Sequence, residues 1–264
     1  MGLDIYAGTL TRYYAKSWKT AVQKWAEANG MSFSRVTPNG DEVPEEKPDV
    51  DEVMQTVVEW RDSIINGVSP KDGPLYEAWP ENNDASYYTD KPDWDAFGAL
   101  LLYGACKKYE LEVPATVAKG WDFQNHPIVK RAFEDEAMNW TLYIRAEWWI
   151  PIDDMFSFTC GSPNGHGITV GTTGSLLAEL AVINELGWQA SEEEILAWTK
   201  TEGYPADATV KDGQYTPVAN NQASAFCARS QEYNTEPLAK FAFSMMYQAA
   251  KFSQENRVPI LMDY

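Results

Sequence analysis

Histidine and cysteine are scarce in this chain, which has 2 His and 3 Cys among its 264 residues. Zinc sites usually need several nitrogen or sulfur ligands at short spacings, and the sequence contains no CxxC, HxxxH or HExxH pattern. Cys106, Cys160 and Cys227 form an odd set without paired spacing, which favours reduced thiols over a disulfide framework. We therefore predict a cytoplasmic protein without a metal ion.

Long hydrophobic runs are also missing. No stretch approaches the roughly 20 apolar residues that are needed to cross a bilayer, and the opening MGLDIYAGTLTRYY has neither the basic start nor the apolar core of a signal peptide. We therefore predict no membrane association and no export.

Basic side chains are the minority charge, with 21 Lys and Arg against 39 Asp and Glu and a formal net charge of -18. No basic groove accompanies the aromatic residues, so we expect no nucleic-acid partner. The excess is concentrated in residues 41–95, which hold sixteen acidic and four basic side chains, whereas residues 1–40 carry a net charge of +3. Such a segment either is a solvated surface or attracts a basic partner, because clustered charge speeds the capture of an opposite surface.

Hydrophobic periodicity and capping patterns predict alternating helices and strands. Strands are expected at residues 3–14, 31–37, 140–148, 155–159, 167–170 and 258–264, with residues 140–148 as the clearest. Helices are expected at residues 18–26, 49–67, 94–109, 125–138, 176–186, 191–198 and 235–249, and a hairpin is expected around residues 211–213. With strands at both ends of the chain, we predict one α+β domain over residues 1–264, with a mixed or antiparallel sheet covered by five to six helices.

Residues 148–187 gather most of the residues that could carry chemistry. Asp153, Asp154, Cys160 and His166 lie between a strand-like and a helix-like segment. An imidazole can activate a thiol, and an aspartate can orient that imidazole, so these four residues define an alternative hypothesis of a small-molecule hydrolase or transferase. No signature of a known cysteine hydrolase surrounds them, and a half-buried cysteine beside a solvent-facing histidine explains the same pattern.

The glycine-rich segment GITVGTTGS, residues 167–175, precedes a predicted helix and could in principle cradle a phosphate. Leu176 follows Ser175 where a P-loop has its lysine, and Val170 occupies the position of the third glycine in GxGxxG. An ordinary strand-to-helix junction, capped by Thr173 or Ser175, is the better interpretation. We therefore expect no cofactor.

Trp148 and Trp149 are adjacent on a predicted strand, so their side chains must point to opposite faces. One of them is then free to be exposed or to cover a pocket, and exposed tryptophans often anchor an interface. A structural subunit that self-associates through such tryptophans is a further alternative.

Four blocks of the sequence, MGLDIYAGTLTRYY, TDKPDWDAFGALLLY, EWWIPIDDMFSF and LLAELAVINELGW, resemble a group of uncharacterised bacterial proteins. The resemblance implies a bacterial cytoplasmic protein but no activity. Our leading hypothesis is therefore a non-enzymatic binding protein that holds a basic protein partner, as a toxin-neutralising immunity protein does. Its expected binding residues are the acidic Asp41, Glu42, Glu45 and Glu46 and the aromatic Trp148 and Trp149.

Overall fold

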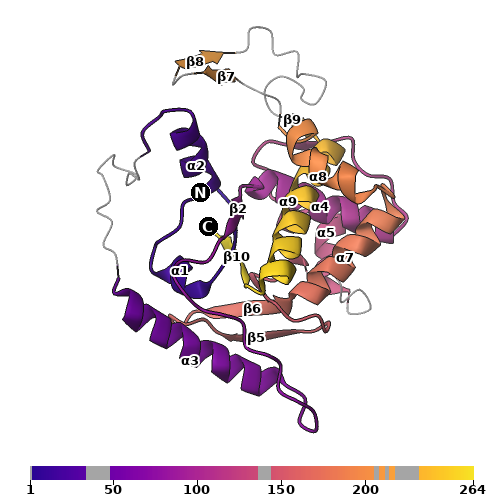
Figure 1. The fold of residues 1–264 in the computed structure, drawn as a ribbon. Helices are drawn as coiled ribbons and strands as arrows, with labels where there is room; N and C mark the ends of the chain where they lie inside the picture. Colours follow the sequence, from indigo (N-terminus) through magenta and orange to yellow (C-terminus); the bar gives the residue numbers. More distant parts are fainter. Residues whose placement is uncertain (1, 34–47, 136–143, 205–207, 212–213, 218–231) are drawn as a thin grey trace.

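A six-stranded mixed sheet forms the centre of the fold in the computed structural model (Figure 1). The structure describes residues 2–33, 48–135, 144–204, 208–211, 214–217 and 232–264. The strands lie in the order β2 (Tyr88–Asp90), β1 (Asp4–Ala7), β10 (Ile260–Asp263), β4 (Trp148–Ile150), β6 (Gly167–Thr172) and β5 (Ser157–Gly161). Neighbouring strands are antiparallel except β4 and β6, which are parallel.

Helices cover both faces of this sheet. One face carries α4 (Asp93–Lys108), α5 (Pro127–Glu134), α7 (Thr173–Leu186), α8 (Glu192–Thr201) and α9 (Thr235–Asn256). The other face carries α1 (Leu10–Tyr14) and α3 (Val50–Val68), and α3 runs along β5 and β6 (Figure 1). The remaining elements are α2 (Ala21–Ala28), the 3-10 helix η1 (Phe123–Asn125), and the strand pairs β3 (Thr116–Ala118) with β9 (Glu232–Asn234) and β7 (Ala208–Lys211) with β8 (Gln214–Pro217).

The predicted α+β class is confirmed. The C-terminal strand lies inside the main sheet, between β1 and β4, so the two ends of the chain are paired with each other. The described residues contain eight α-helices. Seven correspond to the helices that the sequence predicts, and α1 is the additional one, because residues 10–14 were expected to be part of a strand. None of the helices in the described ranges combines the length and apolar character that a membrane crossing requires.

Three strand predictions were wrong in part. Residues 10–14 form α1 instead of extending β1, because the Glu81 carboxylate accepts hydrogen bonds from the backbone N–H groups of Leu10 and Thr11, at 3.2 and 2.8 Å, and so satisfies the first turn of a helix. In the predicted strand 140–148, residues 140–143 lie outside the described residues, and the strand itself begins only at Trp148. The predicted strand at residues 31–37 is absent over residues 31–33, and its remainder also lies outside the described residues.

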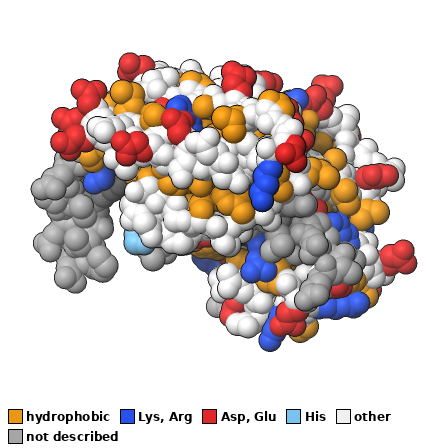
Figure 2. Space-filling model, turned by 90° about the horizontal axis from the view of Figure 1, so that it is seen from below, with side chains coloured by type: hydrophobic (Ala, Val, Ile, Leu, Met, Phe, Trp, Pro, Cys, Tyr) orange, Lys and Arg blue, Asp and Glu red, His pale blue; other side chains and the backbone are white. Residues whose placement is uncertain are grey.

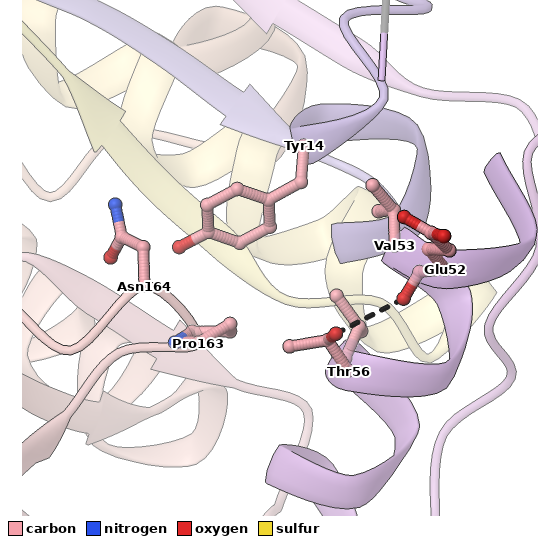
Figure 3. Close-up of a pocket in the computed structure, with 7 residues that line it drawn as sticks. Tyr14, Glu52, Val53, Thr56, Pro163 and Asn164 are labelled. Atoms are coloured by element: carbon pink, nitrogen blue, oxygen red, sulfur yellow. Dashed lines mark hydrogen bonds between the residues drawn. The ribbon is translucent and has the colours of Figure 1, made fainter. Parts of the chain in front are cut away.

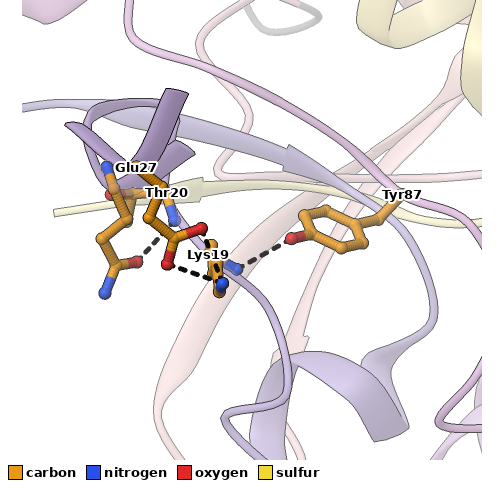
Figure 4. A network of polar contacts seen from close by, with 5 residues as sticks. Lys19, Thr20, Glu27 and Tyr87 are labelled. Carbon is orange, nitrogen blue, oxygen red and sulfur yellow. Dashed lines mark hydrogen bonds and ion pairs between the residues drawn. The ribbon is translucent and has the colours of Figure 1, made fainter. Parts of the chain in front are cut away.

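A small network of polar contacts surrounds the start of the α2 helix and connects it to Tyr87 (Figure 4). The backbone N–H of Lys19 donates to the Tyr87 hydroxyl at 2.9 Å, and the Lys19 ammonium pairs with Glu27 at 2.6 Å. Thr20 forms a reciprocal capping box with Gln23 at the start of the helix. Ala26 is the one fully buried side chain of α2, so this helix adds little to the hydrophobic core.

Candidate functional site

Trp148 and Trp149 are both buried, with exposed fractions of 6% and 0%. Their side chains do point to opposite faces, since Trp148 joins the hydrophobic cluster beneath α3 and Trp149 joins the cluster beneath α4, α7 and α9. Of the alternatives that the sequence left open, an exposed indole is not found, because helices cover both faces of the sheet. Neither indole is available to touch a partner directly. The prediction that Trp148 and Trp149 are binding residues stays untested, and their burial argues against it.

Asp153 and Asp154 lie in the loop between β4 and β5, next to a shallow pocket of about 380 Å³ that Arg257 also lines. The Tyr76 hydroxyl donates a hydrogen bond of 2.6 Å to Asp154, and the Gln254 amide donates a hydrogen bond of 3.4 Å to Asp153. The loop is fixed to the C-terminal end of β6, because the Thr172 hydroxyl donates to the Asp154 carbonyl oxygen at 2.6 Å.

Cys160 and His166 lie near the opposite end of β6. Cys160 is paired with Ile168, and His166 is an exposed residue of the β5–β6 hairpin turn. At about 3.3 Å per residue, the four steps from Ile168 to Thr172 separate Cys160 from the aspartate loop by roughly 13 Å. The structure therefore does not bring the four residues together, and neither aspartate can orient His166 in this arrangement.

The environment of Cys160 also opposes activation of its thiol. Its side chain packs against the hydrophobic cluster beneath α3, and this burial raises its pKa. Cys106 is fully buried in α4, and burial raises its pKa as well. A nucleophilic cysteine needs the reverse shift, because the thiolate is the reactive form.

Alkylation rates can test this conclusion. We expect Cys160 to react with iodoacetamide more slowly than a free cysteine, because its raised pKa lowers the fraction of thiolate. Replacing His166 by Ala should leave that rate unchanged, as measured by mass spectrometry of the Cys160 peptide. A fast Cys160 reaction that slows in the His166→Ala variant would revive the hydrolase hypothesis.

At the end of the glycine-rich segment, the hydroxyl groups of Thr172, Thr173 and Ser175 are occupied by contacts within the fold. Thr172 caps α7 by accepting from the Ser175 N–H at 3.0 Å, and the Thr172 and Ser175 hydroxyls are 2.6 Å apart. The Thr173 hydroxyl lies 2.8 Å from that of Ser253 on α9. The Gly174 N–H donates to the Ile152 carbonyl at 3.0 Å, so a backbone carbonyl already covers this helix start. The segment is a strand-to-helix junction, although its cap is Thr172 and not Thr173 or Ser175.

In the acidic segment of residues 41–95, the acids that the structure describes include two groups with different roles. Asp41, Glu42, Glu45 and Glu46 lie outside the described residues. Several of the others serve the fold: Glu81 accepts hydrogen bonds from the start of α1 and from the Trp79 indole, and Asp95 accepts from the Gly120 N–H.

A second group of acids is exposed along the outer side of α3. These residues, which we call the α3 acidic face, are Asp51, Glu52, Glu59 and Asp62. The opposite side of the helix buries Val57 and Ile65 against the sheet, and this packing fixes which side chains face the solvent. In the view from below the fold, acidic side chains stand out along the border of the surface, with hydrophobic ones between them (Figure 2).

A groove of about 250 Å³ lies beside the α3 acidic face, between α3, α1 and the β5–β6 hairpin. Its lining residues are Tyr14, Glu52, Val53, Thr56, Val57, Pro163 and Asn164 (Figure 3). The Trp60 indole N–H donates to the Gly161 carbonyl at 2.6 Å and so holds the hairpin against α3. Burial raises the pKa of Tyr14 to about 12, so its hydroxyl stays protonated at neutral pH.

The chemistry of this groove suits a side chain that is apolar along its length and positively charged at its end. Val53, Pro163 and the Tyr14 ring offer apolar surface, and the Glu52 carboxylate supplies the negative charge. Lysine and arginine have this character, because their aliphatic stems pack on apolar surface while their charged ends stay hydrated or paired. Sequence reasoning missed the groove, because its residues come from three separate segments.

Among the described residues, no group of three or more His, Cys, Asp or Glu side chains is placed to hold a metal ion. No protein family, curated protein or solved structure matches this chain. Its function is therefore argued from the geometry of the groove and of the α3 acidic face.

Proposed function

We propose that this protein is a non-enzymatic binding protein that holds a basic protein partner against the α3 acidic face, as an immunity protein holds its toxin. The groove beside Glu52 takes a lysine or arginine side chain of that partner. The observation that carries the proposal is the position of this groove directly beside an exposed row of carboxylates on a firmly packed helix.

The local charge balance supports this proposal. Arg61 is the single basic residue of α3, and its side chain is turned inward, since it is 14% exposed and donates to the Trp79 carbonyl at 2.6 Å. It neutralises part of the charge of Asp62, at 2.8 Å. Asp51, Glu52 and Glu59 make no ion pair with another described residue, so their field extends into the solvent.

Each part of this surface has its own role in binding. Exposed carboxylates add little affinity by themselves, but they accelerate the encounter with a basic surface. This acceleration decreases as salt screens the charges. Affinity comes from a desolvated anchor at the centre of an interface. A lysine or arginine stem on Tyr14 and Val53, with its charge beside Glu52, would supply that anchor.

Neutralising the α3 acidic face should slow association with basic peptides. The test variant is D51N/E52Q/E59Q/D62N, and the probe is an array of synthetic peptides rich in lysine and arginine. At low ionic strength we expect the association rate constant to fall by about 10- to 100-fold. Surface plasmon resonance across a series of salt concentrations measures the rate and its salt dependence.

The matched control removes the same number of negative charges elsewhere, at the exposed Glu112, Glu185, Glu193 and Glu255, as E112Q/E185Q/E193Q/E255Q. It should bind the peptides like the wild type. Thr56→Trp fills the groove from an exposed position and should accelerate dissociation while leaving the salt dependence of association intact. Binding that is insensitive to salt, or equal loss in both charge variants, would refute the proposal.

A further inference from the structure

A second cavity, of about 480 Å³, lies on the other side of the sheet, where β6 begins and β10 ends. It is bounded by α4, η1 and α5, and by the residues that lead into β4. Phe97, Phe123 and Met262 form a buried apolar floor. The Trp94 ring extends that floor, since it stacks on Phe123 with centroids 6.2 Å apart.

Two cationic side chains, Arg145 and Lys130, line the same cavity. The Arg145 guanidinium lies over the Phe133 ring, 4.2 Å from its centroid, so the ring supports its flat face. The Lys130 side chain is 59% exposed and is 3.9 Å from Glu134, an ion pair that solvent weakens. Two cations thus lie beside one aromatic cavity in a chain with a net charge of -18.

Among the described residues of the lining, Glu147 is the acidic side chain, and its carboxylate is engaged by the fold. It accepts hydrogen bonds of 2.9 Å from the Thr169 N–H and of 2.9 Å from the Tyr264 hydroxyl. These contacts hold Glu147 against β6 and the C-terminus. The cations are therefore the charged groups of the cavity that remain suited to a ligand.

We propose that this cavity binds a small aromatic carboxylate. The ring of the ligand packs on Trp94 and Phe123, and its carboxylate is held by Arg145 and Lys130. Small-molecule sites have this composition, with a largely apolar lining and a few placed polar groups, and the cavity volume lies within their usual range. A guanidinium matches the planar geometry of a carboxylate. A singly charged ligand fits better than a dianion, because Glu147 and Glu134 offset part of the positive charge.

This site is independent of the proposed function, because it shares no residue with the groove beside α3. The probe for the test is 2-naphthoate, titrated into the protein of residues 1–264 by isothermal titration calorimetry. We expect saturable binding, and weaker binding of the uncharged isostere 2-naphthamide by about tenfold or more, because the amide lacks the charge-assisted contacts.

The variant K130M/R145M should weaken binding of 2-naphthoate by about tenfold or more and leave binding of 2-naphthamide unchanged. The control K119M/K200M removes two exposed lysines outside the cavity and should bind both compounds like the wild type. Gln124→Trp places a large side chain into the cavity from an exposed position and should abolish binding of both. The proposal would be overturned if the wild type showed no saturable binding of 2-naphthoate. It would also be overturned if K130M/R145M and K119M/K200M lost the same amount of binding.

Discussion

Replacing Lys108 by Met should lower the free energy of unfolding by about 3 kcal/mol at about pH 9, and by much less at about pH 6. Lys108 at the end of α4 pairs with Glu179 of α7 at 2.8 Å, and the two side chains are only 9% and 3% exposed. The substitution leaves a carboxylate buried without its counter-charge. Broken buried pairs usually cost about 3–5 kcal/mol, and the lower figure applies here because the carboxyl group can take up a proton.

The pH dependence follows from the pKa of Glu179. Burial raises this pKa to about 7, although the hydrogen bond and charge of Lys108 lower it. A carboxyl group with a raised folded-state pKa contributes stability that is fully present below its unfolded pKa and is lost as pH rises through the folded value. Without Lys108 the pKa of Glu179 in the folded protein rises further. The difference in the free energy of unfolding between variant and wild type therefore increases above pH 7.

Chemical denaturation at the two pH values measures this effect, with Lys107→Met as the matched control. Lys107 is the adjacent lysine, and its ammonium lies over the Tyr103 ring at 5.2 Å from the centroid. Its replacement should cost about 1 kcal/mol or less at either pH. The double variant K108M/E179L should recover most of the lost stability, because apolar residues can replace a buried pair. A loss with Lys108→Met that does not change with pH would contradict the assignment.

Local sequence signals predicted the elements that local contacts stabilise. The predicted helix at residues 49–67 begins where Asp49 accepts hydrogen bonds from the N–H groups of Asp51 and Glu52. The predicted helix at residues 191–198 begins with a capping box formed by Ser191 and Glu194. The predicted hairpin near residues 211–213 also occurs, as the paired β7 and β8. In each case the decisive partners are a few residues apart, so the pattern of the sequence contains them.

Features that depend on distant contacts could not be predicted in this way. The helix α1 owes its start to Glu81, seventy positions away in the chain, and its residues alternate well enough to be mistaken for a strand. The α3 groove joins Tyr14, Glu52 and Asn164 from three segments, and no spacing relates them. Conversely, Asp153, Asp154, Cys160 and His166 are close in sequence but lie toward opposite ends of β6. Proximity along the chain was therefore a poor guide to the site.

Replacing Gly174 by Ala should destabilise the protein by about 3 kcal/mol or more, a large effect for one methyl group. A Cβ atom at this position would lie 1.9 Å from the backbone carbonyl oxygen of Asp153, so the α7 start and the aspartate loop could not keep their present separation. The clash involves backbone and not a flexible side chain, and the loop cannot yield easily, because the Thr172 hydroxyl holds it through the Asp154 carbonyl.

The matched control is Gly67→Ala in the last turns of α3, where an added Cβ meets no other atom within 4 Å. Alanine is the better helix former, so this variant should be unchanged or more stable by about 0.5–1 kcal/mol. Urea denaturation of both variants gives the comparison. If Gly174→Ala were as stable as the wild type, the hydroxyl contacts would not fix the loop, and the start of α7 could open to a ligand. The expected loss of stability would instead mean that Gly174 is needed to let two backbone segments meet. This close approach explains the glycine at this position without a bound phosphate.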